Sequence, residues 1–307
     1  MEEKFARRDF LKAGASSLLA VGTELLHSPF AQASPADVTP AASKTPRLLS
    51  GCCAYTYRRS LLHGPMTLED FILKAVELKL DAVDITVYYL KSTDPAYLED
   101  LRHLGFKNAV TLSGTACGVS MVQADAAKRA AGLDEIKKWI DVADRLGTSH
   151  LRVFAGKLPP GASLQNAIDW VVETMKPASD YAAEKGIMLG LEDHQGVSQS
   201  ADVCLEMVHR VNSPYAGITL DITHFVPTPQ QDVYAQIAAC IPYANVAHIR
   251  DHFDDHTPID LDRVWQLFAA AGFKGYMSFE GDEIDSPNVP KVVSDIQMLC
   301  RKYSSVS

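Results

Sequence analysis

The sequence lacks the features that mark several large classes of protein. After the first dozen residues it has no run of Lys and Arg, and its formal net charge is −9. Surfaces that neutralise phosphates need such basic clusters, so nucleic acid is not an expected partner. Beyond the N-terminal region there is also no stretch of about 18 uninterrupted apolar residues, which a membrane-spanning helix requires. We therefore expect no stable membrane insertion once the N-terminal segment is removed.

Two further absences narrow the fold. The 6 cysteines form no C-x-x-C pair and no dense spacing typical of disulfide scaffolds, so they are expected to be small buried residues. The G-x-G-x-x-G fingerprint follows none of the apolar runs, which argues against an open doubly wound sheet. The whole sequence of 307 residues is 47% hydrophobic and 22% charged, which allows a large hydrophobic core.

Residues 1–33 have the three parts of an export signal. Basic residues that include Arg7 and Arg8 precede a mildly apolar stretch, and Ala31-Gln32-Ala33 is an A-x-A cleavage site. The run from Arg7 to Lys12 resembles the twin-arginine signal, which addresses already folded proteins for export. The alternative is a mobile amphipathic N-terminus that merely contains two arginines. We expect cleavage after Ala33 and a periplasmic or otherwise exported protein.

A linker rich in Pro, Ala, Ser and Thr is expected over residues 34–46. From residue 48 onward, short apolar or β-branched runs alternate with longer stretches of helical period, which is typical of β-α units on a parallel sheet. The expected strands cover residues 48–55, 82–88, 107–113, 150–155, 187–192, 216–222, 245–250 and 275–280. The expected helices cover residues 67–79, 95–104, 125–146, 163–185, 199–211, 230–240, 260–271 and 289–302.

Length supports a closed barrel. Residues 48–303 number 256, or 32 for each of eight units, which is close to the size of a (β/α)₈ barrel. Four glycines that follow expected helices are read as C-caps: Gly105, Gly147, Gly186 and Gly272. The sequence therefore predicts the α/β class, with a single-domain (β/α)₈ TIM barrel over residues 47–307.

Acidic or imidazole side chains end the last four expected strands. They are Glu192, Asp221, His248 and Glu280. In such a barrel the carboxyl ends of the strands converge on one mouth, where three carboxylates and an imidazole would repel and desolvate one another. A divalent cation is the simplest compensation, and an oxygen-rich set suits Mn²⁺, Mg²⁺ or Co²⁺ better than a structural zinc. Taken alone, a Glu such as Glu192 or Glu280 is more commonly a solvated strand end, and a lone Asp221 is also consistent with a cap of the next helix.

Other polar residues near the same ends are candidates for substrate contact. Arg152 is a charge inside an apolar strand, so it either pairs with a carboxylate of the mouth or binds substrate oxygens. His194 and His224 either contact substrate or orient a ligand. Tyr55 follows the first expected strand, where it lines the pocket or packs.

With these residues in place, the sequence resembles the xylose isomerase-like TIM barrel superfamily, the sugar isomerase/epimerase group, over essentially the whole mature chain. The family's E-x-H pattern is Glu192-Asp193-His194, its D-x-x-H pattern runs from Asp221 to His224, and the closing Glu is Glu280. The H-x-K-D pattern is His248-Ile249-Arg250-Asp251, in which Arg250 stands where Lys is frequent. Arg in place of Lys keeps the positive charge but replaces a compact ammonium group with a planar guanidinium that has several donors in a fixed arrangement.

The resemblance implies the chemistry. In the family the four ligands bind one divalent metal ion, here expected to be Mn²⁺ with Mg²⁺, Co²⁺ or Zn²⁺ as alternatives. The two glutamates act as acid and base on opposite faces of a keto sugar, roles that fall on Glu192 and Glu280. We expect an isomerase or epimerase that acts on an unphosphorylated sugar or keto-sugar by proton abstraction through a metal-bound enediolate.

Several alternatives stay open at this point. A lyase or dehydratase acting on a keto-sugar or 3-keto-glycoside would begin with the same proton abstraction. A barrel that binds a sugar without converting it would be marked by a broken ligand set, and here all four positions are filled. The apurinic endonuclease branch is not favoured because its additional histidines on early strands are missing. The sequence leaves homo-oligomer formation undecided.

Overall fold

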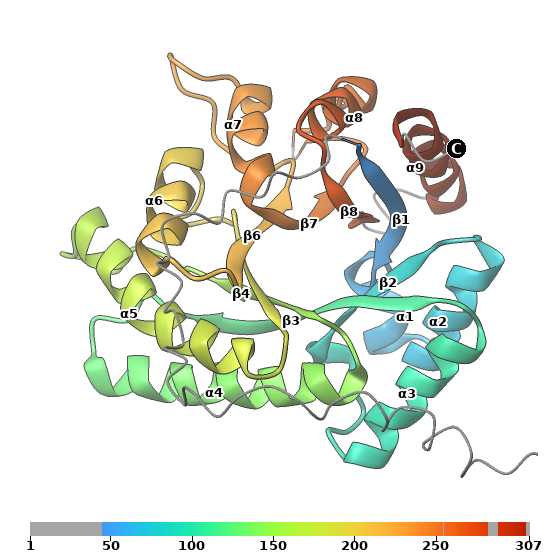
Figure 1. Cartoon of the computed structure of the whole chain (residues 1–307), viewed down its shortest axis with the longest axis horizontal. Helices are drawn as coiled ribbons and strands as arrows, with labels where there is room; N and C mark the ends of the chain where they lie inside the picture. Colours follow the sequence, from blue (N-terminus) through green and yellow to red (C-terminus); the bar gives the residue numbers. More distant parts are fainter. Residues whose placement is uncertain (1–44, 254, 282–287, 305–307) are drawn as a thin grey trace, which may run out of the picture. The chain divides into compact units, whose positions relative to one another are not determined.

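Eight parallel strands hydrogen-bond in chain order and close into a barrel, with β8 paired to β1 (Figure 1). The computed structural model describes residues 45–253, 255–281 and 288–304. The predicted (β/α)₈ fold is therefore confirmed. The predicted export signal, including Arg7 and Arg8, and most of the predicted linker lie outside the described residues. Within the described ranges, no helix is both long and apolar enough to span a membrane.

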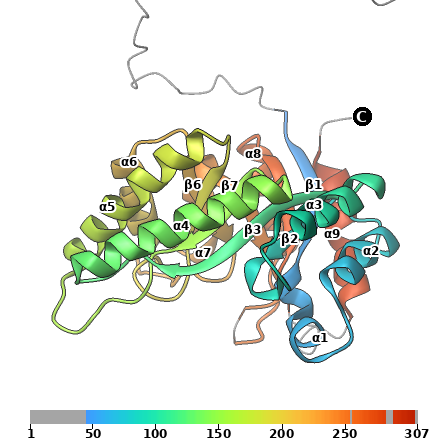
Figure 2. The same ribbon diagram turned by 90° about the horizontal axis from the view of Figure 1, so that it is seen from below.

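The strands are short, as expected for segments buried on both faces. Their bounds are β1 (Arg47–Cys53), β2 (Ala82–Thr86), β3 (Thr111–Ser120), β4 (His150–Phe154), β5 (Met188–Glu192), β6 (Ala216–Asp221), β7 (Ala244–Ile249) and β8 (Lys274–Phe279). Helices surround this ring on the outside (Figure 1). The helices on the outside are α2 (Leu68–Glu77), α3 (Pro95–Lys107), α4 (Ala126–Leu146), α5 (Leu164–Ala183), α6 (Ala201–Val211), α7 (Val233–Cys240), α8 (Leu261–Ala270) and α9 (Val289–Tyr303). Figure 2 shows α3, α4 and α5 side by side along the outside of the sheet.

Short helical segments also occur in the loops, at α1 (Arg58–His63), η2 (Ala54–Tyr57), η3 (Val87–Tyr89) and η4 (Ile241–Tyr243).

Local signals set the ends of the longer helices. Thr67 and Asp70 form a capping box at the start of α2, and Ser163 and Asn166 form the same arrangement at the start of α5. At the other end of α4, Gly147 has a φ of 74° and closes the helix in the left-handed conformation.

The third strand was placed too early by the sequence pattern. Residues 107–113 were expected to form it, but α3 continues to Lys107 and the strand runs from Thr111 to Ser120. The helix ends in a turn in which Ala109 has a φ of 55°, an unusual conformation for a residue other than glycine. Gly105 is therefore a residue inside α3 and not a C-cap.

The apolar core lies between the sheet and the surrounding helices. Its largest fully buried side chains include Trp265, Phe71, Phe268 and Phe279. Inside the barrel, by contrast, polar side chains are buried, among them Asp84, His150, Thr219 and Ser278. Gly190 makes room for two of them, because a Cβ there would lie 2.1 Å from Thr219 Oγ1 and 2.5 Å from His150 Nε2.

Candidate functional site

Four candidate ligands lie together at the carboxyl ends of neighbouring strands. Glu192 is the last residue of β5, Asp221 the last of β6, His248 is the next to last in β7, and Glu280 directly follows β8. The parallel register places Asp221 opposite His248, so the side chains meet because the strands are paired in chain order. Each of the four is at most 3% exposed.

The geometry of these four side chains fits a single cation. One ligand atom from each lies within 4.8 Å of every other. Two ligands on opposite sides of an ion with bonds of about 2.0–2.4 Å are about 4.0–4.8 Å apart, so one ion can reach all four. His248 Nδ1 lies 3.0 Å from Glu280 Oε2 and 3.3 Å from Glu192 Oε1. Glu192 Oε2 is buried without a hydrogen-bond partner among the described residues. Metal binding at this set stays a prediction.

Asp221 is fixed by neighbours on both of its oxygens. Its Oδ1 accepts hydrogen bonds from the backbone N–H of Thr223 at 2.9 Å and from the Thr223 hydroxyl at 2.6 Å. Arg250 Nε donates to Oδ2 at 3.3 Å. Burial opposes ionisation, but the charges of His224 and Arg250 outweigh it and lower the pKa of Asp221. The carboxylate is therefore ionised and held in one orientation, as a metal ligand would need to be.

Arg152 connects the two glutamates. Its Nη1 donates to Glu192 Oε1 at 3.0 Å and to Glu280 Oε1 at 3.4 Å, and its side chain is only 7% exposed. Burial again opposes ionisation, yet the charges of His248 and Arg152 hold the pKa of Glu280 well below its usual range. Of the two roles that the sequence allowed for Arg152, the structure shows the pairing with carboxylates.

Formal charges in this region favour a divalent cation. The acidic side chains are Asp84, Glu192, Asp221 and Glu280, and the basic ones are Arg152 and Arg250. Burial and the Asp221 carboxylate raise the pKa of Asp193 well above its usual range, so that residue is counted as uncharged. Four negative and two positive charges leave two negative charges in excess, which one divalent ion balances.

When no cation is bound, a protonated His248 compensates part of the excess negative charge. Burial lowers the pKa of its ring, but Glu280 and the hydrogen-bonded Asp84 outweigh burial and raise that pKa well above its usual range. A protonated ring then supplies one positive charge to the carboxylates. A cation bound at Nδ1 would replace that proton, as metal ions do at histidine ligands.

A cavity of about 120 Å³ opens above these groups. It is lined by Tyr55, Tyr88, Arg152, Phe154, Glu192, His194, His224, Arg250 and Glu280. All five residues predicted to bind substrate, His194, His224, Arg250, Arg152 and Tyr55, therefore face the same cavity. The His194 ring lies between Phe154 and His224, with ring centroids 4.7 Å from each. The walls thus offer aromatic faces and imidazoles next to the carboxylates.

Sequence reasoning missed Asp84, His150 and Phe154. Asp84 and His150 are buried inside the barrel, and Asp84 Oδ2 lies 3.3 Å from His248 Nε2. The signal was available, because Asp84 interrupts an apolar strand just as Arg152 does. The sulfur of Cys53, one of the cysteines expected to be small buried residues, lies 3.6 Å from Glu280 Oε1. All six cysteines are buried, as expected, and each is a free thiol.

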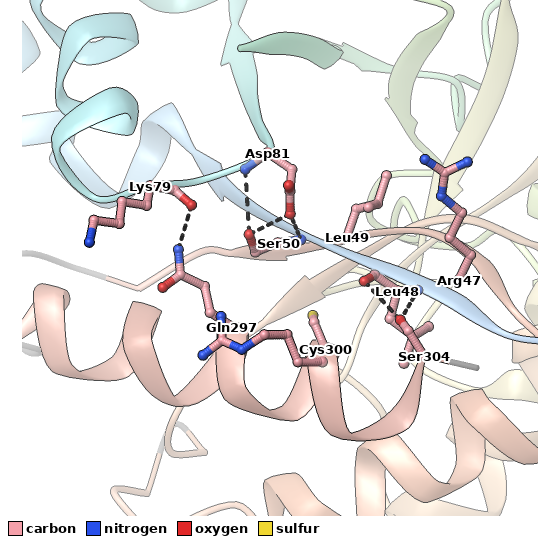
Figure 3. Close-up of a pocket in the computed structure, with 10 residues that line it drawn as sticks. Arg47, Leu48, Leu49, Ser50, Lys79, Asp81, Gln297, Cys300 and Ser304 are labelled. Carbon is pink, nitrogen blue, oxygen red and sulfur yellow. Dashed lines mark hydrogen bonds between the residues drawn. The ribbon is translucent and has the colours of Figure 1, made fainter. Parts of the chain in front are cut away.

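A larger cavity, about 480 Å³, lies at the opposite end of the barrel (Figure 3). It is formed by the start of β1, the segment before β2 and helix α9. Several of its polar groups are engaged in structural hydrogen bonds: Asp81 accepts from the Ser50 hydroxyl at 2.7 Å, and Gln297 donates to the Lys79 carbonyl at 2.7 Å. In barrels of this type the amino-terminal end supports stability and the carboxyl end carries the chemistry.

Comparisons with known proteins agree with the fold. A family model described as xylose isomerase-like TIM barrel matches residues 72–302, and no curated protein matches the chain. An L-ribulose 3-epimerase superposes with a TM-score of 0.68 at 17% identity, over 83% of this chain and 95% of that one. The IOLI protein with a bound zinc atom superposes with a TM-score of 0.66 at 17% identity, over 85% of this chain and 100% of that one. AsbF from Bacillus anthracis, a probable 3-DHS dehydratase, superposes with a TM-score of 0.64 at 14% identity, over 82% of this chain and 98% of that one. At these identities each likeness shows a shared fold.

Proposed function

The chain belongs to the xylose isomerase-like TIM barrel family, and from this premise we propose that it is a divalent-metal-dependent sugar isomerase or epimerase. Its substrate is an unphosphorylated sugar or keto-sugar, and its reaction begins with removal of a proton from a carbon next to a carbonyl. The observation that carries the proposal is the pair Glu192 and Glu280, joined by Arg152 on the wall of the cavity.

The metal centre is proposed from the same four residues, Glu192, Asp221, His248 and Glu280. A bound divalent ion, with Mn²⁺ as first choice, would draw electron density from substrate oxygens and so stabilise negative charge that develops on them. The donor set of three carboxylates and one imidazole fits this class of ion. The L-ribulose 3-epimerase and the zinc-bound protein among the structural neighbours share the fold in which we place this centre.

The two glutamates are proposed as the proton-transfer groups. Glu280 is ionised because the charges of His248 and Arg152 lower its pKa, so the carboxylate is in the unprotonated form that a proton acceptor must have. Arg152 donates hydrogen bonds to both carboxylates, so one of them can hold the proton while the other keeps its charge. Epimerisation needs one carboxylate to take the proton and the second, protonated one to deliver a proton to the opposite face of the same carbon. In aldose–ketose isomerisation the first carboxylate returns its proton to the neighbouring carbon.

Elimination from a keto-sugar or 3-keto-glycoside is the second candidate. The observation that favours it is the pair His194 and His224, which lies beside Asp221, with His224 Nδ1 3.7 Å from Asp221 Oδ2. An imidazole at this place can assist the departure of an oxygen leaving group, a step that an epimerase does not need. A sugar-binding barrel without turnover is less well supported, because every candidate ligand is present and converges on one point.

Proton NMR in deuterated buffer tests the proposal. Metal-free protein is supplied with Mn²⁺, Mg²⁺, Co²⁺ or Zn²⁺ and screened against keto sugars and 3-keto-glycosides. We expect deuterium at the carbon next to the carbonyl of the substrate that is turned over. An inverted centre identifies an epimerase, a moved carbonyl an isomerase, and a lost water or glycosyl group a lyase.

Glu280→Gln should separate proton transfer from binding. The amide keeps the shape and one coordinating oxygen but accepts no proton, so kcat should fall about 10²- to 10⁴-fold with a smaller change in KM. The matched control is Glu99→Gln, at an exposed residue that pairs with Arg145 on the outside of the barrel. Turnover without deuterium uptake, together with recovery of Glu280→Gln in excess Mn²⁺, would show that these carboxylates do not transfer the proton.

A further inference from the structure

A fifth buried acidic side chain, Asp84, lies beside the candidate metal ligands. It occupies the middle of β2, whose five residues are all buried, and its own exposure is 0%. An ionised carboxylate taken out of water is costly unless a partner compensates for it. Its position therefore requires an explanation that the apolar core does not provide.

The contact that Asp84 makes is specific. Its Oδ2 lies 3.3 Å from Nε2 of His248, and its Oδ1 has no hydrogen-bond partner in the described part of the chain. The nearby ring of His150 supplies no charge at neutral pH, because burial lowers its pKa to about 4. Among the described side chains, the hydrogen-bond partner of Asp84 is His248.

The neighbouring strand leaves room for this arrangement. Gly114 lies opposite Asp84 in the register of β3 and β2, at a point where the register shifts by one residue. A Cβ on Gly114 would lie 3.1 Å from Asp84 Oδ2 and 2.8 Å from His150 Nδ1. The absence of a side chain at residue 114 thus allows the carboxylate to point inward to His248.

We propose that Asp84 is a positioning residue that fixes the tautomer and orientation of His248. By accepting a hydrogen bond from Nε2–H, it leaves the lone pair of the neutral ring on Nδ1, the nitrogen that faces Glu192 and Glu280. Carboxylates that accept from the second nitrogen of a histidine ligand orient the ring and make it a better donor. This inference rests on the proposed metal centre and adds the residue that prepares one of its ligands.

The structure also defines the competing explanation. Cys53, Asp84 and His248 have ligand atoms within 4.8 Å of one another, so they could themselves hold a cation through Nε2. A neutral imidazole has one lone pair, so His248 cannot bind a cation at Nε2 and also donate a proton from it. The two explanations therefore predict opposite states of the same nitrogen.

The experiment compares Asp84→Ala, Asp84→Asn and Cys53→Ser in the otherwise unchanged protein. Calorimetric titration of the metal-free forms with Mn²⁺ gives the affinity and the number of ions bound. We expect one ion per chain, a 10- to 100-fold weaker affinity in Asp84→Ala and a smaller loss in Asp84→Asn, whose amide oxygen still accepts the hydrogen bond. Cys53→Ser should bind within about 2-fold of the unchanged protein.

Nitrogen-15 NMR of the Zn²⁺-loaded protein gives a readout that a purely structural role would not change. We expect His248 to carry its proton on Nε2, and this signal to be altered in Asp84→Ala while thermal melting of the metal-free variants shows that they fold. Equal Mn²⁺ affinity in Asp84→Ala and the unchanged protein would overturn the inference and leave the metal centre standing. Two ions per chain, one of them lost in both Asp84→Ala and Cys53→Ser, would establish the competing site. No Mn²⁺ binding by the unchanged protein would overturn the proposed function as well.

Discussion

Replacing Arg152 by Met should destabilise the metal-free protein and strengthen its response to metal. The guanidinium lies 3.0 Å from Glu192 Oε1 and 3.4 Å from Glu280 Oε1, in a place where the three side chains are at most 7% exposed. At an effective dielectric constant of 20, each contact corresponds to a gross attraction of about 5 kcal/mol. Much of this is offset by the cost of removing the charges from water. The loss on breaking a buried pair is about 3–5 kcal/mol.

Melting temperatures measure this loss directly. At about 2 °C per kcal/mol for a domain of this size, Arg152→Met should melt about 6–10 °C below the unchanged protein without metal. The matched control is Arg145→Met, because Arg145 pairs with Glu99 at 3.2 Å while both side chains are more than half exposed. An exposed pair contributes about 0–1 kcal/mol, so that variant should shift by at most about 2 °C.

The response to metal separates electrostatics from packing. Arg152 holds two of the candidate ligands, so its removal lets a cation bind them without competition from the guanidinium. A 10-fold gain in affinity adds about 1.4 kcal/mol, so saturating Mn²⁺ should raise the melting temperature about 3 °C more in Arg152→Met than in the unchanged protein. Equal metal-induced shifts in the two proteins, or equal melting of Arg152→Met and Arg145→Met without metal, would refute this reasoning.

Two further predictions concern pH and processing. Burial lowers the pKa of His150 from 6.5 to about 4, so the unfolded chain gains a proton on this residue before the folded one does; the contribution of His150 to stability is full above pH 6.5 and falls by about 3 kcal/mol as the pH drops to 4. Urea unfolding at each pH should show a smaller fall in His150→Gln than in the unchanged protein, and parallel pH profiles for the two would contradict it. We also propose that the exported protein starts at Ser34, after removal of residues 1–33; an intact N-terminus in the mass spectrum of the exported form would contradict this.

The sequence was informative where its pattern is local. Alternation of apolar runs and helical stretches predicted eight strands and their helices, since each β-α unit carries its own periodicity. The candidate ligands were found because each stands at the polar end of an apolar strand, as Glu192 does after Leu191. The start of β3 was missed because the left-handed turn at Ala109 has no glycine to mark it.

Contacts between strands that are distant in the chain could not be predicted from such local patterns. Asp84 and His248 are 164 residues apart, and their pairing depends on the closure of the barrel. The sequence identified Arg152 as a charge in need of a partner, but could not choose between a carboxylate and a substrate. Closure of the barrel brings Glu192 and Glu280 to the same nitrogen of Arg152, which decides the first role. Contact between Arg152 and substrate oxygens stays a prediction.

Buried polar side chains inside the barrel support this site. Asp84 contacts the candidate ligand His248, and His150 Nε2 lies 3.1 Å from the Thr219 hydroxyl. Side chains of this size fit because glycines occupy neighbouring strand positions, so the space that an apolar barrel would fill with Val or Leu holds polar groups instead. The candidate ligand His248 is therefore held by a hydrogen bond from within the barrel as well as by its own strand. A site built this way keeps its carboxylates oriented before a cation or a substrate arrives, which is the condition for efficient proton transfer at a fixed position.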